Sequence, residues 1–312
     1  MKRVKASALA RGDIILTTST ATVSKAIRLG TKSDISHAMV YVQHCSVIDA
    51  TSEGVHARNT QRLFFEDECA LHVLRLKAGL TPEQAEQVCQ FVRQRVGSEY
   101  STREAIKTVI GGAEQWTRKQ FCSRLVAQAY ASAGIKLVAD PNYCAPADLA
   151  RSSLLVAVPD AMEPATSEDA ARWASHPDST EAMRSAINAV LDGARKKDKN
   201  IQTFEDIIPY LVKHPKEDAY FADILASSGY LTVWQINTEK NPGNMTMSCW
   251  HNCHLMNAKV TAAALCKTKK PGRTAITSIA AQCEACRTNS NLRLLSSFSI
   301  SMTCSRQSTA NG

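Results

Sequence analysis

Short hydrophobic runs separated by turn-forming residues fill the first part of the chain, the pattern of β-strands joined by tight connections. A strand is expected in GDIILTT (12–18), and SHAMVYV and SVIDA, separated by Gln43-His44-Cys45, are expected to form a hairpin. GVHAR and LHVLRLKAG indicate two further strands. Between the first strand and the hairpin, TATVSKAIRLGT places apolar residues at helical spacing.

Helical patterns follow the strands. Thr81 and Gln84 fit a capping box with a proline at the first helical position, so a helix is expected over 81–95 with a glycine shortly after it. Further helices are expected over about 102–109 and 121–133, the latter again ending at a glycine. Strands first and helices afterwards predict an α+β fold with an antiparallel sheet.

Composition divides the chain into three parts. Residues 1–160, closing with a strand in 153–159, are expected to form one compact unit. An Ala-rich helical accessory region is expected over 161–240, followed by a basic tail at 241–312 that contains Cys and His and has weak periodicity. Accessory helices are expected within 161–195, interrupted at His176-Pro177, and at 203–211 and 219–226.

Charge is concentrated at the chain ends. The formal net charge is +8, and residues 241–312 carry eight basic and one acidic side chain. Such a tail could hold the protein near an anionic surface, or it could simply be a solvated segment. No phosphate loop, dinucleotide fingerprint or aromatic-rich nucleic-acid motif occurs, so specific nucleic-acid binding is not expected.

The cysteine pattern and the hydropathy bear on location. Eleven cysteines, an odd number at irregular spacing, do not suggest a disulfide framework and indicate reduced thiols. The N-terminal MKRVKASALARGD lacks the apolar stretch of a signal peptide, and no run of 18 apolar residues occurs. We expect a cytoplasmic protein, or one exported by a signal-peptide-independent route with a secretion or immunity partner.

Cys122 is the first candidate for chemistry. It lies in QFCSRLVAQAYASAG, at the expected N-terminus of an amphipathic helix. Free backbone N–H groups and the positive end of the helix dipole favour a thiolate there, and the same N–H groups can stabilise an oxyanion. A cysteine in an apolar helix is also commonly a core residue.

His37 and Asp49 are candidate partners for that thiol. His37 begins the SHAMVYV strand and Asp49 ends SVIDA, so the hairpin can place the two side chains next to each other. An acid beside a histidine fixes the tautomer whose other nitrogen faces the nucleophile. This is the logic of a Cys–His–acid site in the chain order His, Asp, Cys.

These residues, in this order, resemble a known family. The strings GDIILTT, SHAMVYV, VIDATSEGVHAR, GSEY, FCSRLVAQAY and APADLARS are similar to those of the YiiX/YaeF-type permuted papain-like hydrolases, over about residues 10–158. Relatives include the NlpC-type cell-wall peptidases and the lecithin:retinol acyltransferase group. The resemblance implies a circularly permuted papain-like domain in which Cys122 is the nucleophile, His37 the base and Asp49 the acid, where members commonly have Glu. Tyr100 matches a family tyrosine that could donate to the oxyanion.

Other residues compete for these roles. Glu53 and His56 lie close to the hairpin in sequence, His44 falls in its expected turn, and Cys144 is followed by Ala-Pro. None of these residues fits the roles of nucleophile, base and orienting group as well as Cys122, His37 and Asp49 do.

A zinc site in the tail is a separate hypothesis. CEAC has the spacing of a zinc knuckle, and CWHNCH could supply two further ligands, but no ribbon pattern follows. A reduced tail that binds no metal is the alternative, and we expect no cofactor. The residues concerned are Cys249, His251, Cys253, His254, Cys283 and Cys286.

The candidate residues predict a thiol-dependent acyl hydrolase that acts through a thioester. The resemblance implies that the bond cleaved is an amide, in a peptide or cell-envelope peptide. A lipid acyl hydrolase or acyltransferase is the rival enzyme, because the basic ends would suit anionic lipid. The third hypothesis is a non-catalytic binding protein built on a degenerate papain-like domain.

Overall fold

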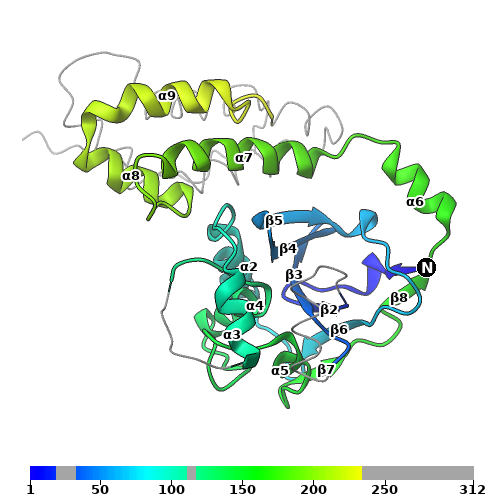
Figure 1. Ribbon diagram of the computed structural model, residues 1–312. Coiled ribbons are helices and arrows are strands. Elements are labelled where there is room, and N and C mark those ends of the chain that lie inside the picture. Colours follow the sequence, from blue (N-terminus) through cyan, green and yellow to red (C-terminus); the bar gives the residue numbers. More distant parts are fainter. Residues whose placement is uncertain (19–32, 111–116, 234–312) are drawn as a thin grey trace, which may run out of the picture.

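A six-stranded antiparallel sheet packed against helices organises the computed structural model, which describes residues 1–18, 33–110 and 117–233. The predicted α+β class is therefore confirmed. The strand order is β5-β4-β3-β2-β6-β7 (Figure 1). These strands are β2 (Ile14–Thr17), β3 (His37–Gln43), β4 (Ser46–Thr51), β5 (Gly54–Asn59), β6 (Leu71–Leu76) and β7 (Leu155–Ala157).

The hairpin predicted from SHAMVYV and SVIDA is present as β3 and β4. His44 and Cys45 form its turn with φ angles of 47° and 56°, as two-residue hairpin turns of the primed types require. Because successive strand residues face opposite sides of the sheet, Val40 packs toward the helices, whereas Met39 packs in a second cluster on the other face.

Four of the described helices lie between β6 and β7 in the chain, and two of them, α2 and α4, pack against β3 in the main core (Figure 1). The predicted capping box at the start of α2 is present, with Thr81 and Gln84 bonding each other's backbone. Gly97 follows α2 with φ +92°, a conformation that suits glycine. The helices are α2 (Pro82–Gln94), α3 (Thr102–Ile110), α4 (Cys122–Ser132) and α5 (Pro146–Ala150).

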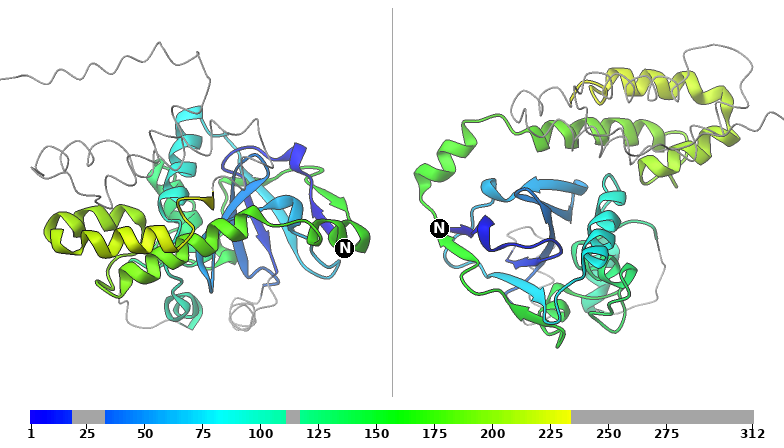
Figure 2. Two further views of the ribbon diagram at one scale, coloured as in Figure 1. Left: turned by 90° about the horizontal axis from the view of Figure 1, so that it is seen from above. Right: turned by 180° about the vertical axis from the view of Figure 1, so that it is seen from behind.

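A small second sheet ties the N-terminus to the segment after the main sheet. β1 (Lys2–Val4) pairs antiparallel with β8 (Met162–Pro164), which lies beyond the expected boundary at residue 160. Both views of Figure 2 place the N-terminus beside this segment. The strands make β8 part of the unit that the sequence assigned to 1–160.

The accessory helices have a hydrophobic core of their own, in which buried residues of α7, α8 and α9 meet. α7 also packs on β5 (Figure 1). It lies so close to Gly97, which follows α2, that a Cβ on Gly97 would overlap the Leu191 side chain of α7. Gln202 accepts a hydrogen bond from the Glu99 amide and donates one to its carboxylate. The accessory helices are α6 (Ser167–Ala174), α7 (Ser179–Arg195), α8 (Phe204–Lys213) and α9 (Asp218–Ser227), with a 3₁₀ turn at Pro215–Glu217. Two further 3₁₀ turns, at Ala6–Ala8 and Thr60–Arg62, lie earlier in the chain.

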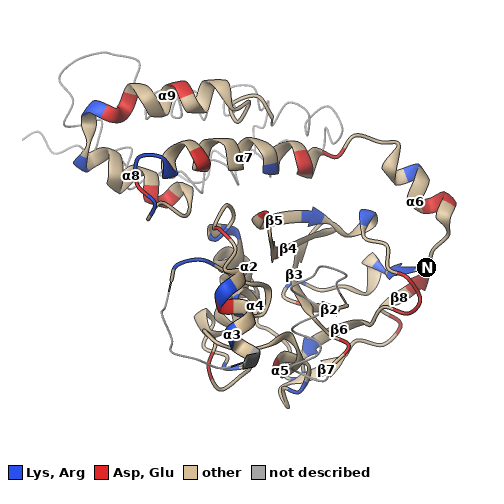
Figure 3. Cartoon of the chain, viewed as in Figure 1, with Lys and Arg blue, Asp and Glu red and all other residues tan. Residues whose placement is uncertain are grey.

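Charged residues of both signs are interspersed along the accessory helices (Figure 3). Within the described ranges no helix combines the length and the apolarity needed to cross a bilayer. The basic tail at 241–312 and the helical pattern in TATVSKAIRLGT lie outside the described residues, so both predictions stay open.

Limited proteolysis is expected to leave a protected N-terminal fragment that ends after β8 and before α7. Pairing of β1 with β8 should protect residues up to about 165, whereas the exposed connection around α6 joins this unit to the accessory helices. Mass spectrometry of the fragments measures the end point. Cleavage inside the main sheet at the same rate as around α6 would contradict the division.

Candidate active site

Cys122 is the first residue of α4, as predicted from the sequence, and is 3% exposed. No side chain caps this helix end in the described part of the chain, and the N-cap residue is Phe121. The thiol Sγ lies 4.0 Å from the Ser36 carbonyl oxygen, directly before β3. An eleven-residue helix therefore presents its positive end at a thiol beside the start of the hairpin.

Arg124 and Ser123 anchor this end of α4. The Arg124 guanidinium is fully buried and pairs with the Glu104 carboxylate of α3 at 3.0 and 3.1 Å. It also donates to the backbone oxygens of Lys119 and Asn142. Ser123 Oγ donates to the Cys144 carbonyl at 2.6 Å. Because a buried ion pair leaves a costly unpaired charge when one partner is removed, this network restricts where Cys122 can lie.

His37 and Asp49 meet across the hairpin, with 2.7 Å between His37 Nε2 and an Asp49 carboxylate oxygen. Asp49 pairs with Met39 in the register, so His37 contacts it diagonally. The shorter aspartate therefore reaches the imidazole where family members commonly carry a glutamate. With Nε2 engaged, Nδ1 is the nitrogen left for the Cys122 thiol.

The electrostatics favour a charged imidazolium. Burial lowers the pKa of His37, but hydrogen bonds to Asp49 and Cys122, together with their negative charges, raise it to about 10. Burial raises the pKa of Asp49, but the hydrogen bond and charge of His37, with Arg58 and His56 nearby, lower it to about 2. The three side chains therefore form one buried electrostatic unit, with the imidazole between the carboxylate and the thiol.

Two residues of β5, Arg58 and His56, complete the surroundings of Asp49. Arg58 Nη1 donates to an Asp49 oxygen at 3.1 Å, and His56 Nε2 lies 3.8 Å from the other oxygen. The sequence interpretation weighed His56 only as a primary catalytic residue and did not consider Arg58. The alternation of β5 signalled both, because residues 56 and 58 share one face of the strand that pairs with β4.

Tyr100 lies close enough to Cys122 for the two groups to interact electrostatically. Burial and the charge of the Cys122 thiolate raise the pKa of Tyr100, so the phenol stays protonated. The backbone of Tyr100 forms an isolated β-bridge with that of Gln120, two residues before Cys122. A neutral hydroxyl is therefore held near the nucleophile, as a hydrogen-bond donor to an oxyanion must be.

The competing candidates lie elsewhere or are engaged. Glu53 is half exposed and pairs with Arg184 of α7 at 3.1 Å. His44 is exposed in the hairpin turn and contacts Gln43. Burial, followed by the charges of nearby groups, raises the pKa of the Cys144 thiol, which disfavours a thiolate.

No group of three or more His, Cys, Asp or Glu side chains arranged to hold a metal ion occurs in the described ranges. The cysteines and histidines of the zinc hypothesis, from Cys249 to Cys286, lie outside those ranges. The hypothesis therefore stays a prediction.

Comparison with known proteins bears on the domain that holds this site. The model of the family described as "Permuted papain-like amidase enzyme, YaeF/YiiX, C92 family" matches residues 8–147. Residues 8–147, just under half of the chain, therefore resemble this family. The matched segment contains Cys122, His37, Asp49 and Tyr100.

A curated relative of this family domain is the probable lipoprotein peptidase YaeF of Escherichia coli (strain K12). It is 25% identical over 181 residues, which make up 48% of this chain and 65% of the relative. The chain thus spans just under two thirds of that protein's length. A solved structure, that of the metalloprotein yiiX from Escherichia coli O157:H7, is 19% identical with a TM-score of 0.32, covering 47% of this chain and 95% of that one.

The match to the family model confirms the resemblance to permuted papain-like amidases that the sequence strings indicated. The accessory helices lie outside the family match, which ends at residue 147. The link to the lecithin:retinol acyltransferase group stays an expectation from the sequence.

Proposed function

We propose that this protein is a cysteine hydrolase that cleaves an amide bond of a peptide or cell-envelope peptide. The proposal is supported chiefly by the 2.7 Å contact between His37 Nε2 and the Asp49 carboxylate, together with the Cys122 thiol at the N-terminus of α4. The match to the family model supports the amidase class. Cys122 is the nucleophile, His37 the general acid and base, and Asp49 the group that orients and charges the imidazole.

In the first half of the reaction, the thiolate of Cys122 attacks the amide carbonyl carbon and the carbonyl oxygen becomes an oxyanion. The backbone N–H groups at the start of α4 and the Tyr100 hydroxyl donate to this oxygen. The imidazolium of His37 then gives its proton to the leaving nitrogen as the carbon–nitrogen bond breaks. The products are a free amine and a thioester on Cys122.

In the second half, neutral His37 takes a proton from water, and the resulting hydroxide attacks the thioester carbonyl. Collapse of this intermediate breaks the carbon–sulfur bond, releases a carboxylic acid and regenerates the thiolate–imidazolium pair. Asp49 stabilises the imidazolium at both stages without taking its proton.

The proposal is tested with parallel substrate panels. Wild type and Cys122→Ala are incubated with peptide amides, peptidoglycan fragments and vesicles of anionic phospholipid, and released amine and fatty acid are measured. Amine release from peptidic substrates, absent in Cys122→Ala, is the expected result. Fatty-acid release alone would favour the lipid acyl hydrolase, and no thiol-dependent release from any substrate would favour the binding protein.

Replacement of Tyr100 by Phe is expected to lower kcat about tenfold to a thousandfold with little change in KM, because one oxyanion donor is lost. Tyr130→Phe is a matched control. Its hydroxyl donates to the Gly12 carbonyl at 2.6 Å in the core, so that variant should lose stability rather than rate. Equal rates per folded molecule in Tyr100→Phe and wild type would remove Tyr100 from the oxyanion site.

Stability is expected to fall as the pH rises above neutral. The folded-state pKa of His37 is about 10, against 6.5 for an unperturbed histidine, so the folded state binds this proton more tightly. The resulting stabilisation is complete below pH 6.5 and is lost as the pH rises through about 10. Asp49, with a pKa of about 2, adds stabilisation that is lost only in strong acid.

Urea unfolding at about pH 6, 7.5 and 9 measures this dependence. The free energy of unfolding of wild type should decrease across the series, and that of His37→Asn should change less. Parallel curves for the two proteins would contradict the pairing of His37 with Asp49.

A further inference from the structure

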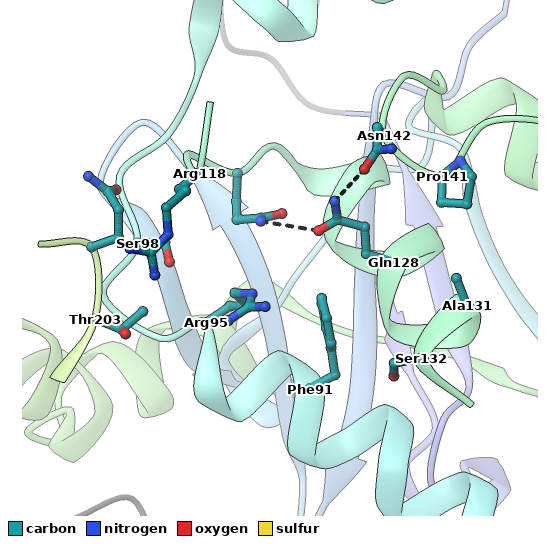
Figure 4. Close-up of a pocket in the computed structure, with 12 residues that line it drawn as sticks. Phe91, Arg95, Ser98, Arg118, Gln128, Ala131, Ser132, Pro141, Asn142 and Thr203 are labelled. Atoms are coloured by element: carbon teal, nitrogen blue, oxygen red, sulfur yellow. Dashed lines mark hydrogen bonds between the residues drawn. The ribbon is translucent and has the colours of Figure 1, made fainter. Parts of the chain in front are cut away.

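A pocket of about 400 Å³ lies where α2, α4 and the start of the accessory α8 meet. Its size is within the range of small-molecule sites. Phe91 and Arg95 come from the end of α2, Gln128 from α4, and Gln202 and Thr203 from the segment that leads into α8. The accessory region therefore supplies one wall of a cavity whose other walls belong to the family domain. Figure 4 shows Arg95 beside Phe91, between Arg118 and Gln128.

Two buried polar atoms in the pocket lining have no hydrogen-bond partner among the described residues. They are Ser98 Oγ, on a residue that is 1% exposed, and Gln120 Oε1, on a residue that is 4% exposed. A buried polar group without a partner costs about 1–3 kcal/mol. Two such atoms on residues that line one pocket point to a ligand that supplies their partners.

The orientation of Gln120 specifies one ligand group. Its Nε2 donates to Gln128 Oε1 at 3.2 Å, and Gln128 Nε2 donates to Asn142 Oδ1 at 2.7 Å, as the dashed lines in Figure 4 mark. This chain of amides leaves the carbonyl oxygen of Gln120, a residue that lines the pocket, as an acceptor without a partner. A ligand N–H group is its natural partner.

The two arginines specify a second group. The Arg118 charge is compensated by Asp206 at 2.6 Å. The Arg95 guanidinium lies over the Phe91 ring at 4.7 Å, and no carboxylate is within ion-pair distance of it in the described ranges. Glu205, Asp206 and Arg118 act on Arg95 only through longer-range charge interactions. One uncompensated guanidinium beside a free serine hydroxyl suits a single carboxylate better than a phosphate dianion.

We propose that this pocket binds the carboxyl-terminal residue of a peptide. That residue carries a carboxylate and an amide N–H on the same carbon. Arg95 and the Ser98 hydroxyl bind the carboxylate, and Gln120 Oε1 accepts the hydrogen bond from the N–H. The apolar lining from Phe91, Ala131 and Pro141 contacts the side chain. The assignment rests on the pocket and is independent of the role given to Cys122.

Binding to the full-length protein tests the proposal, with N-acetyl-L-alanine as the carboxylate probe and N-acetyl-L-alanine amide as its neutral match. Ligand-detected NMR titration should show saturable binding of the acid, at least about tenfold tighter than that of the amide, or about 1.4 kcal/mol. Arg95→Gln should weaken binding of the acid by a similar factor. Arg103→Gln, on an exposed residue of α3 outside the pocket, should leave it unchanged.

Each alternative has its own outcome. Equal binding of acid and amide, or unchanged binding in a folded Arg95→Gln, would overturn the carboxylate site. Inorganic phosphate that competes more tightly than the acid would overturn the ligand class. No saturable binding of any probe would mean that water satisfies Ser98 and Gln120. The same titration with Cys122→Ala should give the wild-type affinity, which separates this result from failure of the proposed hydrolase activity.

Discussion

Cys122→Ala is expected to reduce turnover by about a thousandfold or more while the protein stays folded, because the sulfur that forms the thioester is removed. Apart from its interaction with His37, the thiol approaches the Ser36 carbonyl oxygen at 4.0 Å. The measurement is the rate of amine release per folded molecule, with folding followed by circular dichroism.

Cys89→Ala is the matched control. Cys89 is also buried in the core, where its thiol donates to the Val42 carbonyl at 3.6 Å, away from His37. This variant should lose some stability and keep its rate. Near-wild-type turnover in Cys122→Ala would refute the nucleophile assignment, and a comparable rate loss in Cys89→Ala would attribute the effect to packing.

Asp49→Asn is expected to lower the rate per folded molecule by about a hundredfold or more, and more than Asp49→Glu does. Asparagine can still contact His37 but brings no charge to stabilise the imidazolium, and its amide can favour the wrong tautomer. Glutamate keeps the charge. Because Asp49 is fully buried, the additional methylene should cost about 1–3 kcal/mol of stability.

Turnover and thermal midpoint, measured for both variants, separate catalysis from folding. If Asp49 only stabilises the hairpin through Arg58 and His37, both variants should lose stability with equal rates per folded molecule. That outcome would remove Asp49 from the catalytic unit. Glu53, the next acidic residue after Asp49 in the sequence, is a poor candidate for the same role because it pairs with Arg184 on α7.

The elements that local chemistry specifies could be predicted from the sequence. Thr81 and Gln84 identified the start of α2, and the hairpin around His44 and Cys45 followed from two short β-rich runs separated by a turn. The meeting of His37 and Asp49 could be inferred because one short turn joins their strands. Signals of this kind lie within a few residues of the element that they define.

The features that depend on contacts between distant segments were not predictable in this way. β8 is three residues long with no distinctive pattern, and its pairing with β1 depends on the path of the whole domain. The Glu104–Arg124 pair that fixes the start of α4 joins two helices. The pocket at Arg95 is lined in part by Gln202 and Thr203, which lie far from Arg95 in the sequence. The position of Arg58 beside Asp49 could be inferred only from the register of β5 with β4.

Mass spectrometry of an acyl-enzyme tests the central claim most directly. The protein is incubated with an activated peptide ester, quenched in acid during turnover and digested. The expected product is a peptide that contains Cys122 and carries the mass of the acyl group, formed far more slowly in His37→Asn. An acyl group on another residue such as Cys144, or turnover of the ester with no adduct on Cys122, would contradict it.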